Sequence, residues 1–258
     1  MLIAITREVS PRVTECELTH LARTPISLER ARVQHRQYEE LLTELSCKLI
    51  RLHAEPELPD SVFVEDTAIV LDELAVITRP GAESRRAETA SVAGVLKQYR
   101  KLFHIELPGT LDGGDVLRIN KTLYAGLSAR SNPEGIEQLR RLLAPFGYSV
   151  TAVELHDCLH LKSAVTQVAE NTLLINHAWA DARVFDSYKL VKVDPSEPFA
   201  ANSLLIGNTA IYPEAFPKTR KRLEVQGIDV RTVDASELAK AEGGVTCCSL
   251  IFAAPAAP

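Results

Sequence analysis

The amino-acid sequence predicts a single domain of the α/β or α+β class that spans residues 1–258. Short runs of β-branched residues alternate with helical patterns along the chain, and two strands often precede the next helix. No stretch rich in Gly, Ser and Pro divides the chain in two. These observations favour a repeated strand-strand-helix-strand unit over one doubly wound sheet. The repeat is one of element order, since no residue pattern recurs at a fixed period.

The predicted strands share β-branched residues and end at turn residues or at a charged helical stretch. They cover residues 2–6, 48–52, 75–78, 102–106, 116–119, 122–125, 149–153, 172–175, 190–193, 204–206, 209–212 and 228–232.

Helical patterns are strongest at residues 27–46, 83–99, 133–145 and 214–226. Ser27 is a suitable N-cap for the first helix, since its hydroxyl can accept a free backbone N–H. Asn132 and Pro133 give the third helix an N-cap and a first helical residue. The small, Pro-containing tail at 253–258 is expected to be frayed.

The composition is that of an ordinary soluble globular protein, with 46% hydrophobic and 24% charged residues. A net charge of −5 disfavours nucleic acid and anionic membrane surfaces as partners. The N-terminal apolar run is shorter than the about 7–15 residues of a secretory signal, and no stretch approaches the roughly 20 needed to span a bilayer. Five cysteines, an odd number without regular spacing, indicate free thiols in a reducing compartment. We therefore expect a cytoplasmic protein.

Polar, charged and Gly-rich residues gather in segments where strands should end. Three carboxylates in the first segment, if they are not simply a solvated acidic loop, repel one another unless a cation lies among them. In an extended chain, Asp60 and Asp66 would share one face. The segments are 60–66 (DSVFVED), 79–86 (RPGAESRR), 109–115 (GTLDGGD), 159–162 (LHLK) and 243–249 (GGVTCCS).

Each segment alone has an ordinary structural interpretation. Arg85 and Arg86 could pair with nearby glutamates on a helix surface, or form a fork that binds a carboxylate. Asp112 could accept hydrogen bonds from turn amides. The residues alone do not decide between these alternatives.

His160 and Cys247 are the candidates for proton transfer and nucleophilic attack. His160 lies between two leucines, where a structural histidine is the more common case, but its ordinary pKa near 6.5 suits acid-base catalysis. A nucleophilic cysteine needs a histidine or a positive potential to hold it as thiolate, which links Cys247 to His160 if the two lie close together. Cys247 and Cys248 would face opposite sides of an extended chain.

Together and in this order, the segments resemble the guanidine-modifying superfamily, and most closely its dimethylarginine dimethylaminohydrolase family. The resemblance rests on DSVFVED, ITRPGAESRR, TLDGGD, LHLK, AAN at Ala200–Asn202 and GGVTCCS, and runs from about Leu18 to Cys247. It implies the pentein fold, a five-bladed pseudo-symmetric α/β propeller of strand-strand-helix-strand units around a central channel. The compact length favours this family over the deiminases and amidinotransferases, which are typically longer.

The resemblance also implies roles for individual residues. Cys247 matches the nucleophile, His160 the general acid and base, and Asp112 the acid that orients the site, where related members carry Glu. The implied substrate-binding residues are Glu65 and Asp66 for the guanidinium, Phe63 as a pocket wall, Arg85 and Arg130 for the carboxylate, and Asp60 with the backbone carbonyls of Leu18 and Ala241 for the α-ammonium. At Ala241 some relatives carry a larger aliphatic residue.

The implied reaction is hydrolysis of N-methylated L-arginines to citrulline and methylamine or dimethylamine through a covalent thiouronium on Cys247. It needs a small-molecule substrate, no metal and no organic cofactor, and a homodimer is expected because related microbial enzymes can pair. Two alternatives stay open: another guanidine-group hydrolase such as an arginine deiminase, and a catalytically silent propeller that acts as a binding protein.

Overall fold

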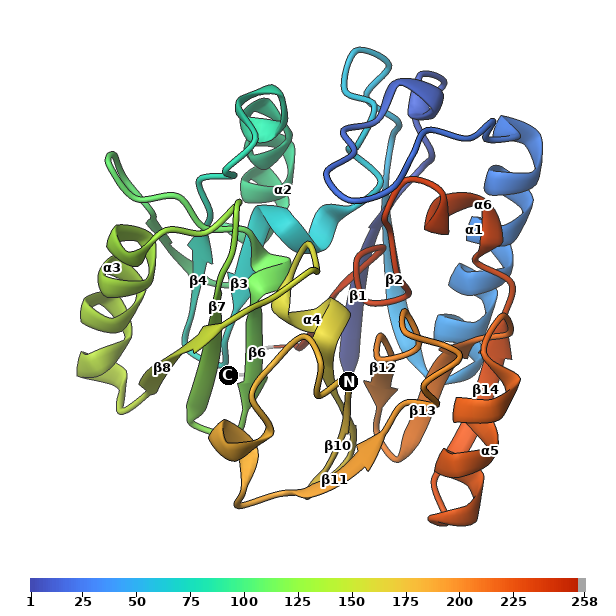
Figure 1. Cartoon of the computed structure of the whole chain (residues 1–258). Helices are drawn as coiled ribbons and strands as arrows, with labels where there is room; N and C mark the ends of the chain where they lie inside the picture. Colours follow the sequence, from blue (N-terminus) through green and yellow to red (C-terminus); the bar gives the residue numbers. More distant parts are fainter. Residues whose placement is uncertain (255–258) are drawn as a thin grey trace.

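The computed structural model of the chain describes residues 1–254, which form five three-stranded sheets arranged around a common centre (Figure 1). In every sheet the first strand runs antiparallel to the second, and the second runs parallel to the third. The five-bladed propeller of strand-strand-helix-strand units is therefore confirmed.

The first strand of each sheet lies on the inside. The sheets contain, in this order, β15 (Leu250–Ala253), β1 (Leu2–Arg7) and β2 (Cys47–Leu52); β3 (Ala68–Val70), β4 (Leu74–Ile77) and β5 (Lys101–His104); β6 (Val116–Ile119), β7 (Thr122–Leu127) and β8 (Ser149–Glu154); β9 (Val165–Ala169), β10 (Thr172–Ile175) and β11 (Lys189–Lys192); β12 (Leu204–Ile206), β13 (Thr209–Pro213) and β14 (Asp229–Val233).

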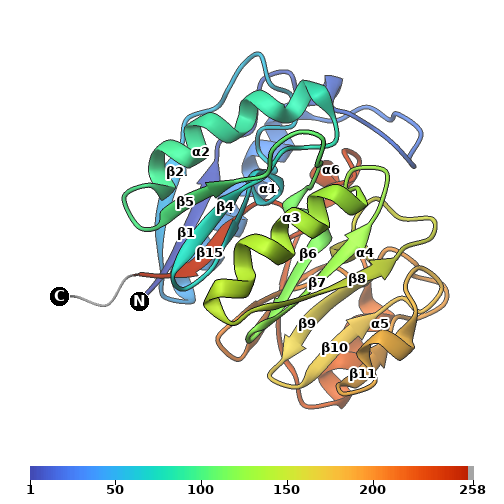
Figure 2. The ribbon, with the colours of Figure 1, turned by 90° about the vertical axis from the view of Figure 1, so that its left-hand side faces the viewer.

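A helix connects the second strand of each unit to the third, because two parallel strands need a crossover connection. Figures 1 and 2 show the longer helices on the periphery, outside the sheets. The connections are α1 (Leu28–Glu44), the 3₁₀ helix η3 (Glu83–Glu88) with α2 (Thr89–Leu96), α3 (Pro133–Leu143), the 3₁₀ helix η6 (Ala182–Phe185) and α5 (Pro217–Val225).

The predicted helix caps are confirmed. The Ser27 side chain accepts a hydrogen bond from the Arg30 N–H at 3.4 Å, and Asn132 accepts one from Gly135 at 2.8 Å. The helix predicted from residue 83 begins instead with the 3₁₀ turns of η3, and the one predicted from residue 214 begins at Pro217. Pro217 suits the first helical turn because its missing N–H would have no partner there.

Three inner strands, β3, β9 and β15, were not predicted, although all twelve predicted strands are present with small shifts at their ends. The missed strands have only three to five residues and follow closely on the polar segments, so each apolar run is too short to indicate a strand by itself. Fraying of the tail is wrong for Ala253, which ends β15, while residues 255–258 lie outside the described part of the chain.

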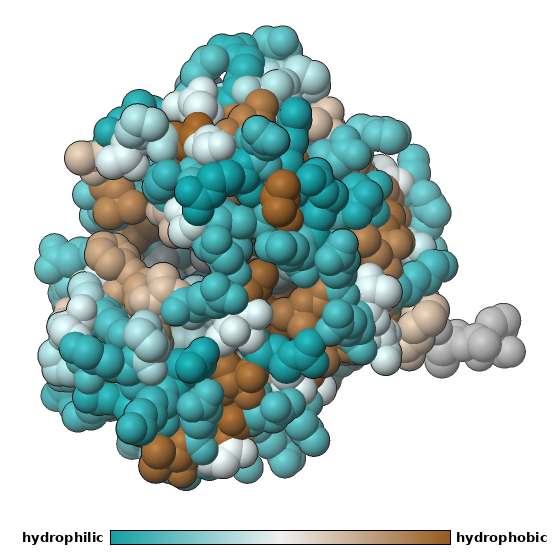
Figure 3. All heavy atoms as spheres, turned by 90° about the vertical axis from the view of Figure 1, so that its right-hand side faces the viewer, coloured by the Kyte–Doolittle hydropathy of each residue, from teal (hydrophilic) through white to brown (hydrophobic). Residues whose placement is uncertain are grey.

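A cavity of about 270 Å³ on the axis is lined by residues of all five inner strands. It corresponds to the predicted central channel. On the face shown in Figure 3, hydrophilic side chains predominate, with hydrophobic ones in scattered patches. Among the helices of residues 1–254, none is long and apolar enough to cross a membrane.

Candidate active site

Four of the five polar segments, and Ala200–Asn202, meet because each precedes an inner strand; segment 79–86 follows β4 and leads into η3 instead. Residues 60–66 lead into β3, residues 109–115 into β6, residues 159–162 into β9, Ala200–Asn202 into β12 and residues 243–249 into β15. Since the five inner strands surround one axis, the segments before them converge at the same end of the channel. The order of elements therefore brings together side chains that are far apart in the sequence.

A narrow cavity at this end contains most of the predicted site. Eight of the predicted residues line it: Asp60, Phe63, Asp66, Arg85, Arg130, His160, Ala241 and Cys247. Glu17, Leu159, Glu242 and Gly243 complete the lining. Leu18, Glu65 and Asp112 are the predicted residues that lie outside it.

His160 is held between two buried carboxylates. Its Nε2 lies 3.0 Å from Asp112 Oδ2, and its Nδ1 lies 3.8 Å from Asp66 Oδ1. Burial disfavours the charged ring, but the nearby carboxylates of Asp66, Asp115 and Asp112 raise the pKa of His160 to about 9. The imidazolium is thus the dominant form at neutral pH and can act as a proton donor.

The backbone at His160 is not part of a strand. His160 is the residue before the short helix α4 (Leu161–Ala164), and β9 begins only at Val165. Asp115 is the second aspartate of the LDGGD sequence. It accepts a hydrogen bond from the Leu161 N–H at 2.9 Å and so fixes the start of this helix.

Asp66 is ionised, and both of its carboxylate oxygens accept hydrogen bonds from the protein. It accepts hydrogen bonds from Arg85 Nη1 at 2.6 Å and from the Gly114 N–H at 2.9 Å. Burial opposes its ionisation, but the positive charges of His160 and Arg85 lower the pKa of Asp66 to about 2. The site therefore presents a fixed negative charge beside the acid-base histidine.

Segment 60–66 is not extended, so the predicted alternation of faces is wrong. The chain turns at Phe63 into the 3₁₀ helix η2 (Val64–Thr67), which sends Asp66 toward His160 and Glu65 toward the channel. Glu65 pairs there with Lys162 Nζ at 2.6 Å and accepts a hydrogen bond from Thr246 Oγ1 at 2.7 Å. Neighbouring carboxylates thus serve two different cavities.

Cys247 lies in the turn between the short helix α6 (Ser236–Ala239) and β15, and its Sγ accepts a hydrogen bond from the Gly244 N–H at 3.3 Å. Burial, together with the negative charges of Glu65 and Asp66, raises the pKa of the Cys247 thiol to about 12. Cys248 belongs to the buried core instead, with its thiol near the Gly244 carbonyl. The two cysteines differ in direction because of this turn, and not because of the extended alternation that the sequence predicts.

The two predicted carboxylate-binding arginines have different surroundings. Arg85 is buried and pairs with both Asp66 (2.6 Å) and Glu88 (2.8 Å). Arg130 donates to Thr19 Oγ1 at 3.0 Å and pairs with no carboxylate among residues 1–254. Arg86 pairs with Glu83 at 3.1 Å near the surface, as its helical position suggested.

A loop around residues 17–21 borders the cavity through Glu17, and we call it the covering loop. Hydrogen bonds connect it to residues of the site. Asp60 Oδ2 accepts a hydrogen bond from the Glu17 N–H at 3.0 Å. The Glu242 carboxylate accepts the N–H groups of three consecutive loop residues, Thr19, His20 and Leu21. Leu18 lies within this loop, and its side chain packs against the core.

Asp115 and Glu242 support the site, although no role was predicted for either residue from the sequence. Asp115 is fully buried, accepts the hydroxyls of Ser128 and Ser131 at 2.6 Å each, and thereby links the His160 segment to the turn that carries Arg130. Burial raises the pKa of Asp115 to about 6. Its place in the Gly-rich segment was a usable signal, whereas nothing in the sequence around Glu242 indicated the loop that it binds.

Asp66, Asp112 and His160 offer ligand atoms within 4.8 Å of one another, close enough to hold a cation. The two carboxylates already accept hydrogen bonds, Asp66 from Arg85 and Gly114 and Asp112 from Gly81. A polyatomic cation that has its own hydrogen-bond donors fits this arrangement at least as well as a metal ion does.

A thiol, an imidazolium and paired carboxylates at one end of a five-unit propeller define the guanidine-modifying, pentein class. The arginine deiminase family model matches residues 54–212. The dimethylarginine dimethylaminohydrolase of Pseudomonas aeruginosa is 36% identical over 86% of this chain and 89% of its own, and that of Streptomyces coelicolor is 39% identical over 96% and 95%.

Solved structures give the same result. The Pseudomonas aeruginosa enzyme, as a cysteine-to-serine variant complexed with citrulline, superimposes with a TM-score of 0.92 at 33% identity over 96% of this chain and 98% of its own. The N-terminal domain of the cyanobacterial arginine dihydrolase ArgZ shares the fold, with a TM-score of 0.89 at 21% identity over 100% of this chain and 99% of that domain. The chain belongs to the dimethylarginine dimethylaminohydrolase family.

Proposed function

We propose that this protein hydrolyses N-methylated L-arginines to L-citrulline and dimethylamine or methylamine. The observation that carries the proposal is the common cavity of Cys247, His160 and Asp66, in which a nucleophile, a proton donor and a fixed negative charge surround one point. The dimethylarginine dimethylaminohydrolases to which the chain is similar support the choice of substrate.

Substrate binding follows from the charges around the cavity. Asp66 receives the guanidinium directly, and Glu65 adds negative charge from the channel side. Arg130, which has no carboxylate partner among residues 1–254, binds the substrate carboxylate. Asp60 and the backbone carbonyls of Leu18 and Ala241 receive the α-ammonium, with Phe63 as a wall. Arg85 holds Asp66 in position.

The first chemical step is attack by the Cys247 thiolate on the central guanidinium carbon. The thiol is neutral in the free enzyme, and the bound cation favours its ionisation, with release of the proton to solvent, by placing positive charge beside the sulfur. A C–S bond forms, His160 gives its proton to the departing nitrogen, and the C–N bond to dimethylamine breaks. A thiouronium cation on Cys247 remains.

The second step returns the enzyme to its starting state. His160 is now neutral and takes a proton from a water molecule that attacks the thiouronium carbon. The C–S bond breaks, the proton of the new hydroxyl group passes to the sulfur, and citrulline leaves with the new oxygen atom as its carbonyl oxygen. Asp112 holds the imidazole ring throughout through the contact at Nε2. No step needs a metal or an organic cofactor.

A second candidate is hydrolysis of unmethylated arginine, because the arginine deiminase family model matches residues 54–212. Incubation with asymmetric dimethylarginine, monomethylarginine, arginine and agmatine, followed by assay of citrulline and the released amine, separates the two. We expect the methylated arginines to have the highest kcat/KM. Higher kcat/KM for arginine would favour a deiminase, and no product from any substrate would favour a binding protein.

The nucleophile assignment is tested with the neighbouring cysteine as the control. Cys247→Ser should abolish citrulline formation, whereas Cys248→Ser should retain most of it, because Cys248 lies in the core. Turnover by Cys247→Ser would overturn the assignment.

We also propose a cytoplasmic location, since an oxidised nucleophile is inactive and a reducing compartment keeps Cys247 as a thiol. A homodimer is proposed from the family resemblance, and size-exclusion chromatography with light scattering measures it.

A further inference from the structure

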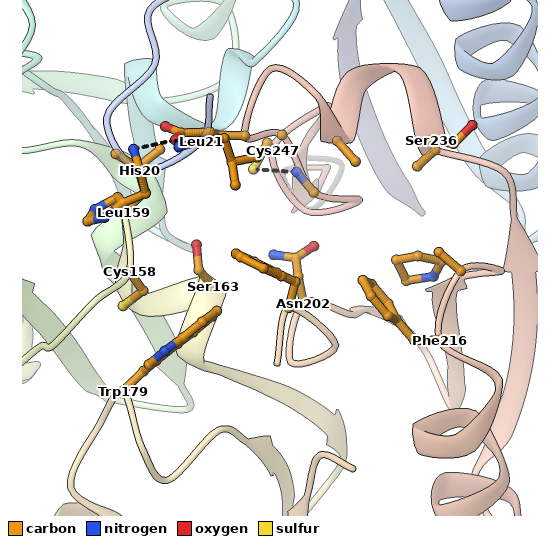
Figure 4. A pocket seen from close by; sticks show the side chains of 18 of the residues that line it. His20, Leu21, Cys158, Leu159, Ser163, Trp179, Asn202, Phe216, Ser236 and Cys247 are labelled. Atoms are coloured by element: carbon orange, nitrogen blue, oxygen red, sulfur yellow. Dashed lines mark hydrogen bonds between the residues drawn. The ribbon is translucent and has the colours of Figure 1, made fainter. Parts of the chain in front are cut away.

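An apolar cavity of about 240 Å³ lies directly beside the substrate cavity (Figure 4). We call it the apolar chamber. Trp179 and Phe216 stand on opposite sides of it, Asn202 lies between them, and Cys247 lies above (Figure 4). Its main apolar side chains are Leu21, Leu159, Trp179, Phe199, Pro213 and Phe216.

The chamber reaches the nucleophile. Cys247, Leu159, Glu242 and Gly243 line both the chamber and the narrow substrate cavity. Attack requires the guanidinium carbon to come within about 3–3.5 Å of the sulfur. A group attached to a guanidinium nitrogen is therefore within reach of the chamber while the carbon faces Cys247.

Two of the polar groups in the chamber wall are already engaged within the protein. The Glu242 carboxylate accepts three N–H groups of the covering loop. The Asn202 amide accepts the Thr246 N–H at 3.1 Å and donates to the Lys162 carbonyl at 3.0 Å. These two groups are not free to bind a polar ligand. His20, Asp157, Ser163 and Ser236 also line the chamber, but its exposed surface is mainly apolar, and the chamber therefore favours an apolar occupant.

Part of the aromatic surface in the chamber is exposed to water, and its burial by a ligand would be favourable. Phe199 is 51% exposed and packs edge-to-face on Trp179, with ring centroids 5.2 Å apart. An apolar ligand would remove this surface from water, which is favourable. An aromatic ligand could also extend the edge-to-face packing.

The volume sets the size of the occupant. An apolar protein cavity of about 150 Å³ takes up benzene, so two methyl groups would leave most of the 240 Å³ chamber empty. We propose that the enzyme accepts arginines whose departing nitrogen carries an apolar group as large as benzyl, and that the chamber holds this group. The inference rests on the proposed function and extends its substrate class.

The chemistry is that of the methylated substrates. With Nω-benzyl-L-arginine, the thiolate forms the C–S bond, His160 protonates the benzyl-bearing nitrogen, and the C–N bond to benzylamine breaks. Water then releases citrulline from Cys247. One water is consumed, and the products are citrulline and benzylammonium.

The test compares Nω-benzyl-L-arginine with asymmetric dimethylarginine by assay of citrulline and benzylamine. We expect the two values of kcat/KM to lie within about tenfold of each other for the unchanged enzyme. Ala239→Phe fills the chamber from α6 and should lower the ratio of benzyl to dimethyl kcat/KM at least tenfold. Ala144→Phe, on an exposed turn after α3, is the matched control and should leave the ratio unchanged.

Phe199→Ser removes an aromatic side chain from the chamber wall and should also reduce the ratio of benzyl to dimethyl kcat/KM. This second variant keeps the test valid should Ala239→Phe fail to fold. Turnover of dimethylarginine, with the benzyl compound neither hydrolysed nor a competitive inhibitor, would overturn the inference and leave the proposed function intact. An unchanged ratio in both chamber variants would also overturn it. Absence of citrulline from both substrates would overturn the proposed function and this inference together.

Discussion

Arg85 and Arg130 have the same functional group and the same expected role, but burial and neighbours separate them. Arg85 is enclosed with Asp66 and Glu88, so its charge stabilises two buried carboxylates. Arg130 faces the cavity with one neutral partner, Thr19. At the scale of residues, the groups that contact each arginine thus determine whether it stabilises the protein or is free to bind the substrate.

This difference predicts different consequences of substitution. Arg130→Ala should raise KM for asymmetric dimethylarginine about 10- to 100-fold with a smaller effect on kcat, because a charged hydrogen bond contributes roughly 1.5–3 kcal/mol. Arg85→Ala should instead lower the free energy of unfolding by about 3–5 kcal/mol, because it leaves buried carboxylates unpaired.

Steady-state kinetics and urea denaturation measure the two effects, with Arg183→Ala as the exposed control. An unchanged KM in Arg130→Ala would contradict the role proposed for that arginine.

The pKa of His160 predicts a second effect at the same scale. Negative charge around the ring raises the pKa of His160 to about 9, so the proton donor is present below that pH and lost above it. Asp112→Asn removes one of these charges and should move the alkaline limb of the kcat profile roughly 1–3 pH units lower.

The measurement is kcat as a function of pH, with Asp72→Asn, a surface partner of Arg118, as the control. A lower kcat with an unmoved alkaline limb would show that Asp112 acts in another way.

At the scale of elements, the site depends on the short segments before the inner strands. The sequence identified these segments by composition, but it did not predict the short helix after His160 or the 3₁₀ helix at Val64. Both are single turns whose hydrogen bonds come from distant residues, such as Asp115 to Leu161 and Cys247 to Glu65. Local propensity contains no information about such partners.

The covering loop gives a prediction at this scale. Glu242→Gln replaces one acceptor oxygen by a donor, so the N–H groups of residues 19–21 lose part of their hydrogen bonding, at about 0.5–1.5 kcal/mol each. We expect faster tryptic cleavage after Arg23 and a KM raised several-fold.

Glu83→Gln, which alters an exposed ion pair, is the control for this comparison. Equal rates of cleavage in all three proteins would show that Glu242 does not hold the loop.

At the scale of the whole molecule, the two ends of the chain close the propeller. β15 pairs antiparallel with β1, so that Leu2 lies opposite Ala253. Phe252 of β15 is 5% exposed and packs edge-to-face on Tyr99 of the second unit. The last described strand therefore joins the first and second units.

Phe252→Ala should lower the free energy of unfolding by about 3–5 kcal/mol through the cavity that it leaves. Val225→Ala, at a residue that is 73% exposed, should change it by less than about 0.5 kcal/mol. Chemical denaturation measures both values, and a small effect at Phe252 would contradict the closing role of β15.

The sequence by itself determined every strand except the inner strands β3, β9 and β15, the helix caps at Ser27 and Asn132, and the residue types that can hold and attack a guanidinium. These features depend on neighbours in the chain: periodicity, capping and composition act over a few residues. The family resemblance added the propeller and the roles of Cys247 as nucleophile and His160 as general acid and base.

The tertiary structure alone decided which charges meet. It placed Asp66 beside His160 and Glu65 in the channel. It also paired Arg85 with two carboxylates and formed an apolar chamber next to Cys247. Burial and the distance between charges set these outcomes, and both depend on residues far apart in the chain, 181 positions apart in the case of Glu65 and Thr246.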